Sequence, residues 1–210
     1  FYRWTQKALG KYYTQKQYLR QKSLLGKIRA LIARGEIEPS KDLFRDFSSE
    51  EPVFFGICLQ RQHLDPLHFP KELEVKNGFR PFFFSLVGSW GPLFLPLLWQ
   101  AFLEWHSFLS EVKNYSPFTE SLITNHFYRE NHKIWTPWMI RFAYETGTKC
   151  LYPNLPGNLS LVANYREAGE NYDTTMGPNS VVLEDIHMNL SISNYSYSTT
   201  GRSISDVVWH

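Results

Sequence analysis

Residues 81–103 read PFFFSLVGSWGPLFLPLLWQAFL, a run of 23 residues without a charged side chain. Twelve of these residues are Phe, Leu or Val. A helix of this length would extend about 35 Å, which exceeds the roughly 30 Å thickness of the hydrocarbon core of a bilayer. Trp105 and His106 follow the run, where an aromatic residue commonly anchors a membrane helix at the interface. The run therefore predicts one transmembrane helix over residues 81–105.

The same run contains breaks that allow a second interpretation. Gly91 and Pro92 would divide it into two pieces that are each too short to span, so a buried helical hairpin in a soluble protein is the alternative. If the run spans, Pro92 and Pro96 should kink the helix. Small residues at Gly88, Ser89 and Gly91 would let another helix approach closely, which indicates packing inside an assembly.

The charges on the two sides of the run predict an orientation. Residues 1–80 carry 15 Lys/Arg and 9 Asp/Glu, whereas residues 104–210 carry 7 and 11. Basic flanks stay on the cytosolic or matrix side of a membrane. We therefore expect the N-terminal part on that side and the C-terminal part across the membrane.

Residues 1–35 predict one long basic helix, because they contain nine Lys/Arg and no Asp/Glu. Apolar residues recur at helical spacing at Leu24, Ile28 and Leu31. Gly35 is a natural end for this helix, and a second short helix is expected over residues 39–47. Together with a connector, this helix forms the first expected segment, residues 1–80.

A basic amphipathic helix of this kind has three interpretations. Its apolar side can pack on a partner while its polar side faces solvent. Alternatively, it can lie on anionic lipid, or it can contact nucleic acid, which is the least favoured of the three. The four tyrosines and the single serine of residues 1–35 make it a poor match for a mitochondrial transit sequence.

Histidines elsewhere in the chain do not predict a metal site. His63 and His68 lie in the mixed connector of residues 48–80, where Pro66 prevents a regular helix. His126 and His132, with Glu130 between them, match no metal-ligand spacing and are interpreted as a helix end at the surface. His106 lacks the second histidine that a haem site would need in the apolar run.

Residues 106–150 predict a helical segment. Ser116-Pro117 and Thr136-Pro137 each combine a capping residue with a proline at the first helical position. Gly147 is expected to end the second of these two helices.

Residues 151–210 predict an irregular segment with a small β element. Ser, Thr, Asn and Tyr make up 24 of these 60 residues, and alternation is clear over residues 186–192. Glycosylation sequons begin at Asn158, Asn189 and Asn194, and a fourth at Asn114 is weakened by Pro117. The apolar content is too low for an independent core, so we expect this segment to lie over something else.

Composition and motifs exclude several classes of protein. The chain has 210 residues with 17% aromatic residues, which excludes a disordered chain, and its two cysteines exclude a disulfide-dense scaffold. The net charge of +2 does not indicate nucleic-acid binding. We find no nucleotide, hydrolase, zinc or dinucleotide motif, and therefore predict no catalytic, cofactor-binding or metal-binding residue and no cofactor.

These observations predict a mainly α fold with a basic N-terminal helix, one kinked transmembrane helix, two short helices and a loop-rich C-terminal segment with a small β element. The expected function is that of a non-catalytic, single-pass accessory or scaffold subunit of a large membrane complex. The complex is expected in the mitochondrial inner membrane, with the N-terminus in the matrix and the C-terminus in the intermembrane space. It would belong to the respiratory chain or to the ATP synthase. Its partners would be other subunits, with anionic lipid at the basic helix.

Two alternatives remain open from the sequence. The first is a type II membrane glycoprotein of the endoplasmic reticulum or Golgi with a lumenal binding or enzymatic region, which the sequons favour. The second is a soluble helical protein that binds a partner or RNA.

Overall fold

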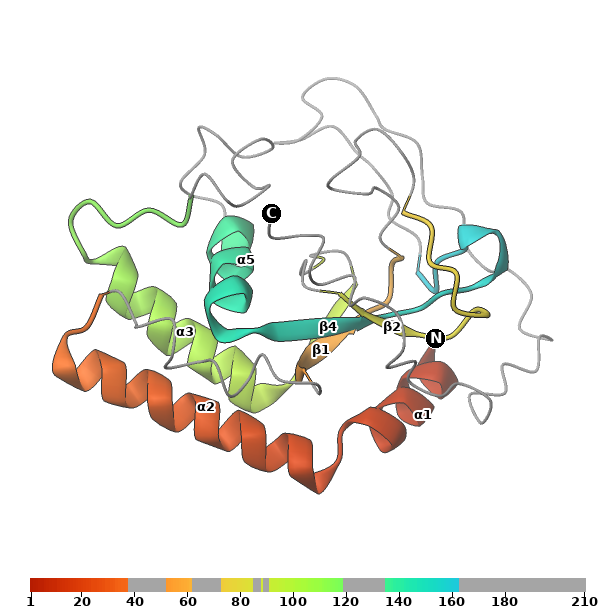
Figure 1. The fold of residues 1–210 in the computed structure, drawn as a ribbon, viewed down its shortest axis with the longest axis horizontal. Coiled ribbons are helices and arrows are strands. Elements are labelled where there is room, and N and C mark those ends of the chain that lie inside the picture. The colour runs from red at the N-terminus through yellow and green to blue at the C-terminus, as the bar shows by residue number, and fades with distance from the viewer. Residues whose placement is uncertain (38–51, 62–72, 85–87, 89–90, 119–134, 163–210) are drawn as a thin grey trace, which may run out of the picture.

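The computed structural model describes residues 1–37, 52–61, 73–84, 88, 91–118 and 135–162 (Figure 1). The helices are α1 (Tyr2–Tyr12), α2 (Gln15–Arg34), α3 (Pro96–Ser110) and α5 (Trp135–Thr146), with a short 3-10 helix, η2 (Pro156–Asn158). The strands are β1 (Val53–Cys58), β2 (Phe82–Phe84), β3 (Pro92–Phe94) and β4 (Thr148–Tyr152).

The four strands form one mixed sheet in the order β2-β4-β1-β3. β1 runs parallel to β4, with Val53 beside Thr148, and antiparallel to β3, with Gly56 beside Phe94. β2 pairs with β4 in the antiparallel direction. Phe55 is an extra residue in β1 relative to β4, because the register shifts between Phe54 and Gly56.

The two faces of this sheet carry different helices. α2, α3 and α5 cover one face, where residues such as Phe55, Phe84 and Tyr152 join the larger hydrophobic core. α1 covers the other face, where Trp4 and Ala8 pack in a second cluster with strand residues of β1 and β4. Figure 1 shows α2 and α3 side by side along the lower edge of the molecule. α1 lies beyond the N-terminal end of α2, past the bend that joins the two helices.

The prediction of a transmembrane helix over residues 81–105 is wrong. In the described part of that range, β2 and β3 are strands, and a helix begins only at Pro96. No helix among the described residues is both long enough and apolar enough to cross a membrane. The prediction of a mainly α fold is also wrong, because a four-stranded sheet forms the centre of the molecule.

Local chemistry explains why the apolar run does not form one helix. Gly91 adopts a left-handed φ of 59°, which ends any regular element at that residue. Pro92 lacks an N–H group and lies in the edge strand β3, where prolines are tolerated. Pro96 then occupies the first turn of α3, where its missing N–H group costs nothing. The apolar side chains that suggested a lipid contact, such as Leu98 and Phe102, are instead buried in the core.

The basic N-terminal segment is two helices instead of the single one predicted. The chain breaks between α1 and α2 at Tyr13 and Thr14, and the Thr14 hydroxyl accepts a hydrogen bond from the Gln17 N–H group at 3.3 Å. The predicted end at Gly35 is confirmed, because Gly35 caps α2 in the left-handed conformation.

Two glutamines of α2 fix this helix to the central strand. Gln17 donates to the Pro52 carbonyl at 2.9 Å and accepts from the Phe54 N–H group at 3.0 Å. Gln21 donates to the Phe54 carbonyl at 2.6 Å. Both side chains are buried, so they satisfy backbone groups of β1 as a neighbouring strand would.

The predictions for the rest of the chain have mixed outcomes. The helix expected near Thr136 is confirmed as α5, and Gly147 follows its last residue with a φ of 65°. Thr136 does not cap this helix, because Trp135 and Thr136 already belong to it. The interpretation of residues 48–80 as a connector missed strand β1. Strand β4, which begins at Thr148 after the predicted helix end, was also not predicted. Predictions outside the described residues are the helix over 39–47, the helix continuing from Pro117 and the strand over 186–192.

An ion pair between α2 and α3 predicts a pH dependence of stability. Arg29 donates two hydrogen bonds to the Glu104 carboxylate, at 2.9 and 2.8 Å, and these bonds hold the pKa of Glu104 below its usual value. A carboxyl whose pKa is lowered in the folded state stabilises the fold above its unfolded pKa, near 4.5. That contribution is lost as the pH falls through the lower folded value.

We therefore expect Glu104→Gln to lower the free energy of unfolding slightly at pH 7, with the difference from wild type shrinking below pH 4.5. Urea denaturation at pH 7 and at about pH 3 measures both differences. An equal difference at the two pH values would show that the ion pair contributes nothing.

Candidate functional site

Four exposed cations lie on the first two helices, and we call them together the basic surface. They are Arg3, Lys7 and Lys11 on α1 and Lys22 on α2. Within the part of the chain that the structure describes, Arg3, Lys7 and Lys22 take part in no hydrogen bond or ion pair. The Lys11 ammonium lies 5.5 Å from the centre of the Tyr12 ring. No group among the described residues therefore neutralises these charges.

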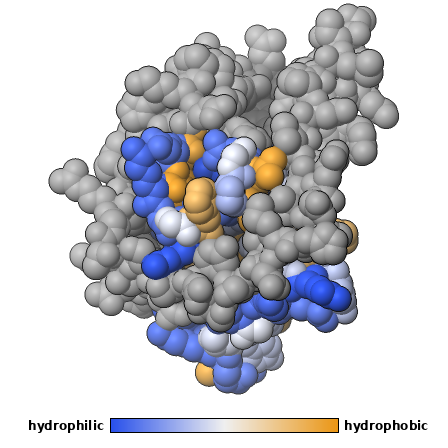
Figure 2. Space-filling model, turned by 90° about the vertical axis from the view of Figure 1, so that its right-hand side faces the viewer, coloured by the Kyte–Doolittle hydropathy of each residue, from blue (hydrophilic) through white to orange (hydrophobic). Residues whose placement is uncertain are grey.

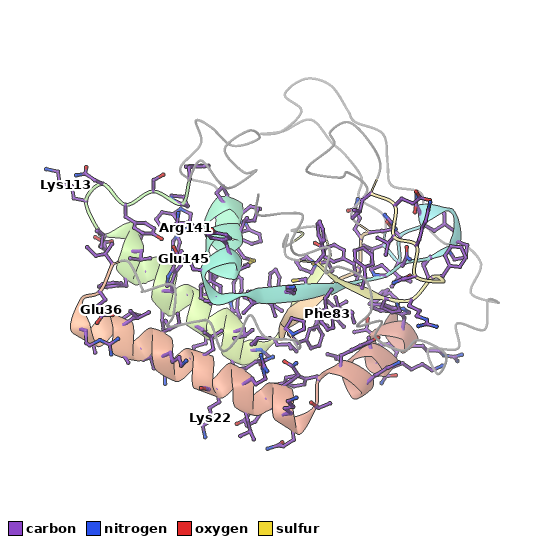
Figure 3. All side chains as sticks on the ribbon, viewed as in Figure 1. Lys22, Glu36, Phe83, Lys113, Arg141 and Glu145 are labelled. Carbon is purple, nitrogen blue, oxygen red and sulfur yellow. The ribbon has the colours of Figure 1, made fainter. Side chains whose placement is uncertain are left out.

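Other described cations contrast with this surface because they pair with carboxylates. The pairs are Arg29–Glu104, Arg34–Glu36, Lys76–Glu74 and Arg141–Glu145. Figure 3 shows Lys22 directed away from the body of the molecule, while Arg141 and Glu145 lie together beside α5. Lys113 is another exposed cation without a described partner, and it lies at a different corner from Lys22.

The helices that carry the basic surface are held by their apolar sides. Trp4 and Ala8 of α1 are buried on one face of the sheet, and Leu24 and Ile28 of α2 are fully buried on the other. The apolar stripe that the sequence left open for a partner is therefore occupied by the chain's own core. In Figure 2, hydrophilic residues make up much of the described surface on the face that carries α1.

A second group of polar side chains lies at the carboxyl ends of the parallel strands β1 and β4. Arg61, which follows β1, donates to the Asn154 side-chain oxygen at 3.3 Å and to the Leu73 carbonyl at 2.9 Å. Its guanidinium carbon lies 5.7 Å from the centre of the Phe82 ring. The Ser160 hydroxyl accepts from the Arg61 N–H group at 3.1 Å. Arg61 is only 2% exposed.

Asn154 extends this network to the segment that leads into β2. Its amide donates to the Val75 carbonyl at 3.0 Å and to the Asn77 side-chain oxygen at 2.7 Å. Asn77 in turn donates to the Arg80 carbonyl and accepts from the Arg80 N–H group. The described bonds tie three separate chain segments together, so we assign this network a structural role. The sequence analysis missed it, although its residues directly follow two short apolar runs.

The two cysteines form a buried cluster beside Tyr152. Cys58 donates to the Gly88 carbonyl at 3.4 Å, and both thiols are free and fully buried. Burial raises the pKa of the Cys150 thiol and of the Tyr152 hydroxyl well above their usual values. Cys150 and Tyr152 therefore stay neutral near pH 7, and the cluster acts as part of the core.

The described residues among those named in the sequence analysis do not come together in a site. His106 is half-buried beside the Trp138 ring, with centroids 4.9 Å apart, and burial lowers its pKa. Asn114 is exposed and Asn158 half-buried, both with positive φ. The described residues contain no group of three His, Cys, Asp or Glu side chains placed to hold a metal ion. Several of the residues named in the sequence analysis lie outside the described ranges, namely His63, His68, His126, Glu130, His132, Asn189 and Asn194.

Comparisons with family models, curated proteins and solved structures found no match to this chain.

Proposed function

We propose that the chain is a non-catalytic accessory subunit of a membrane-associated complex, and that it is held there through the basic surface. One observation carries this proposal: cations on rigidly packed helices have no counter-charge within the described molecule, whereas Arg29, Arg34, Lys76 and Arg141 do. A cluster of unneutralised charge of one sign attracts a negatively charged partner and orients its approach. The setting that we propose is the mitochondrial inner membrane.

The test is whether the basic surface holds the chain in its native complex. We expect the combined variant Arg3→Gln, Lys7→Gln, Lys11→Gln and Lys22→Gln to be lost from the complex in a native gel or a sucrose gradient. The exposed positions carry little folding energy, so the variant should unfold at nearly the same temperature as wild type.

A matched pair of single variants controls for the loss of charge alone. Lys22→Gln should weaken retention in the complex, while Lys113→Gln removes another exposed charge elsewhere and should not. Retention of the combined variant at the wild-type level would overturn the proposal.

The proposed location makes a separate prediction about the sequons. Oligosaccharide transfer takes place in the secretory lumen, so a mitochondrial chain should carry no sugar at Asn158, Asn189 or Asn194. Intact-mass measurement of the native protein checks this directly. A sugar at any of the three would place the protein in the secretory pathway instead.

A further inference from the structure

We infer that the basic surface binds the headgroups of an anionic lipid bilayer. This inference rests on the proposed function and names the chemistry of one partner in the complex, the lipid around it. Three features of the described residues carry it: the spacing of the cations, the side chains exposed among them and the rigidity of the two helices.

The cations of α1 form a row. Arg3, Lys7 and Lys11 are spaced four residues apart, and residues at this spacing lie on the same side of a helix. The row is about 12 Å long at 1.5 Å per residue. Each side chain can therefore reach a different headgroup, and each basic residue near an anionic membrane surface strengthens binding by about fivefold.

Exposed apolar and aromatic side chains accompany the cation on α2. Tyr18 and Leu19 are 39% and 54% exposed, and Lys22 follows them by one helical turn, so the three share one side of α2. Tyrosine favours the headgroup region of a bilayer, and leucine favours the acyl chains beneath it. The phosphates of a nucleic acid offer no apolar contact to Leu19, so this combination favours lipid.

The two helices present these side chains in a fixed arrangement. α1 is held by the burial of Trp4 and Ala8, and α2 by the bonds of Gln17 and Gln21 to strand β1. Binding therefore needs neither refolding nor release of the buried apolar sides. The large exposed apolar side chains near these cations are few: Tyr18 and Leu19 on α2, and Phe1 and Tyr2 at the start of α1. The charges should therefore supply much of the attraction, and the binding should weaken with salt.

Vesicle sedimentation with the full-length chain tests this inference. We expect binding to vesicles of phosphatidylcholine with about 30% phosphatidylserine at 0.1 M salt, and at least tenfold weaker binding to phosphatidylcholine alone. Salt at 0.5 M should release most of the bound protein. Lys22→Gln should weaken binding about fivefold, whereas Lys113→Gln should leave it unchanged.

Leu19→Gln separates the apolar contribution from the charge. It should weaken binding by a factor that is the same at 0.1 and 0.3 M salt, because it removes no charge. The variants should share the wild-type thermal unfolding temperature, since the three positions are exposed.

Several outcomes would overturn the inference. These are equal binding to the two kinds of vesicle, no effect of Lys22→Gln, or tighter binding to duplex RNA that displaces the vesicles. If wild type fails to bind vesicles while the combined variant is still lost from the native complex, the lipid inference is wrong and the proposed function is retained. If vesicles bind but retention in the complex does not depend on the basic surface, the proposed function falls instead.

Discussion

Replacing Gly56 by alanine is expected to force strand β3 away from β1 and to lower the free energy of unfolding by about 2–4 kcal/mol. A Cβ atom at Gly56 would lie 2.4 Å from the Leu93 carbonyl oxygen and 3.0 Å from the Phe94 Cα atom. Both are backbone atoms of the paired strand, so no side-chain rotation relieves the clash. The strands would have to separate, at the cost of ladder hydrogen bonds such as that from Leu95 to Phe55.

Gly26→Ala is the matched control for this prediction, because it adds the same methyl group elsewhere. Apart from the neighbouring residues and backbone of α2 itself, no atom lies within 4 Å of a Cβ at Gly26. Alanine favours a helix over glycine, so this variant should be more stable than wild type by about 0.5–1 kcal/mol. Urea denaturation measures both effects. A Gly56→Ala protein as stable as wild type would contradict the close approach of β1 and β3.

Replacing Arg61 by methionine is expected to lower the free energy of unfolding by about 3–5 kcal/mol. Methionine keeps the apolar stem but removes the donors to Asn154 and Leu73 and the contact with the Phe82 ring. The Asn154 side-chain oxygen and the Leu73 carbonyl would lose their bonds to Arg61. Hydrogen bonds that involve a charged group are worth about 1.5–3 kcal/mol each, which sets the expected size.

Two further variants sharpen this second prediction. Arg61→Lys keeps the charge but lacks the planar guanidinium group that donates in two directions. Its stability should therefore lie between that of wild type and that of Arg61→Met. Arg3→Met changes an exposed arginine of the basic surface and should alter the free energy of unfolding by less than about 0.5 kcal/mol. Urea denaturation of the three variants measures the series. If Arg61→Met cost no more than Arg3→Met, the network at the ends of β1 and β4 would have no structural role.

Features encoded within a few neighbouring residues were predictable from the sequence. The ends of α2 at Gly35 and of α5 at Gly147 each need only a residue that tolerates a positive φ. The break at Thr14 was also encoded locally, as a capping threonine three residues before Gln17, but the regular spacing of apolar residues obscured it.

Features that depend on pairing between distant segments were not predictable. The run over 81–103 has the composition of a membrane helix, because the residues that fill a protein core are also those that favour lipid. The same ambiguity hid β1 in a connector, since its strand character depends on β4, which is almost a hundred residues away in the chain.

The sequence by itself determined the ends of α2 at Gly35 and of α5 at Gly147 and the concentration of positive charge in residues 1–35. Only the tertiary structure decided that the described part of the apolar run forms strands β2 and β3 and helix α3, and which of the described cations pair with a carboxylate. Arg29 and Lys22 are indistinguishable in sequence terms, yet Arg29 faces Glu104 of α3 and Lys22 faces no carboxylate among the described residues. The physical reason is that propensities and caps act between near neighbours, whereas burial and charge pairing depend on which distant segments the fold brings together.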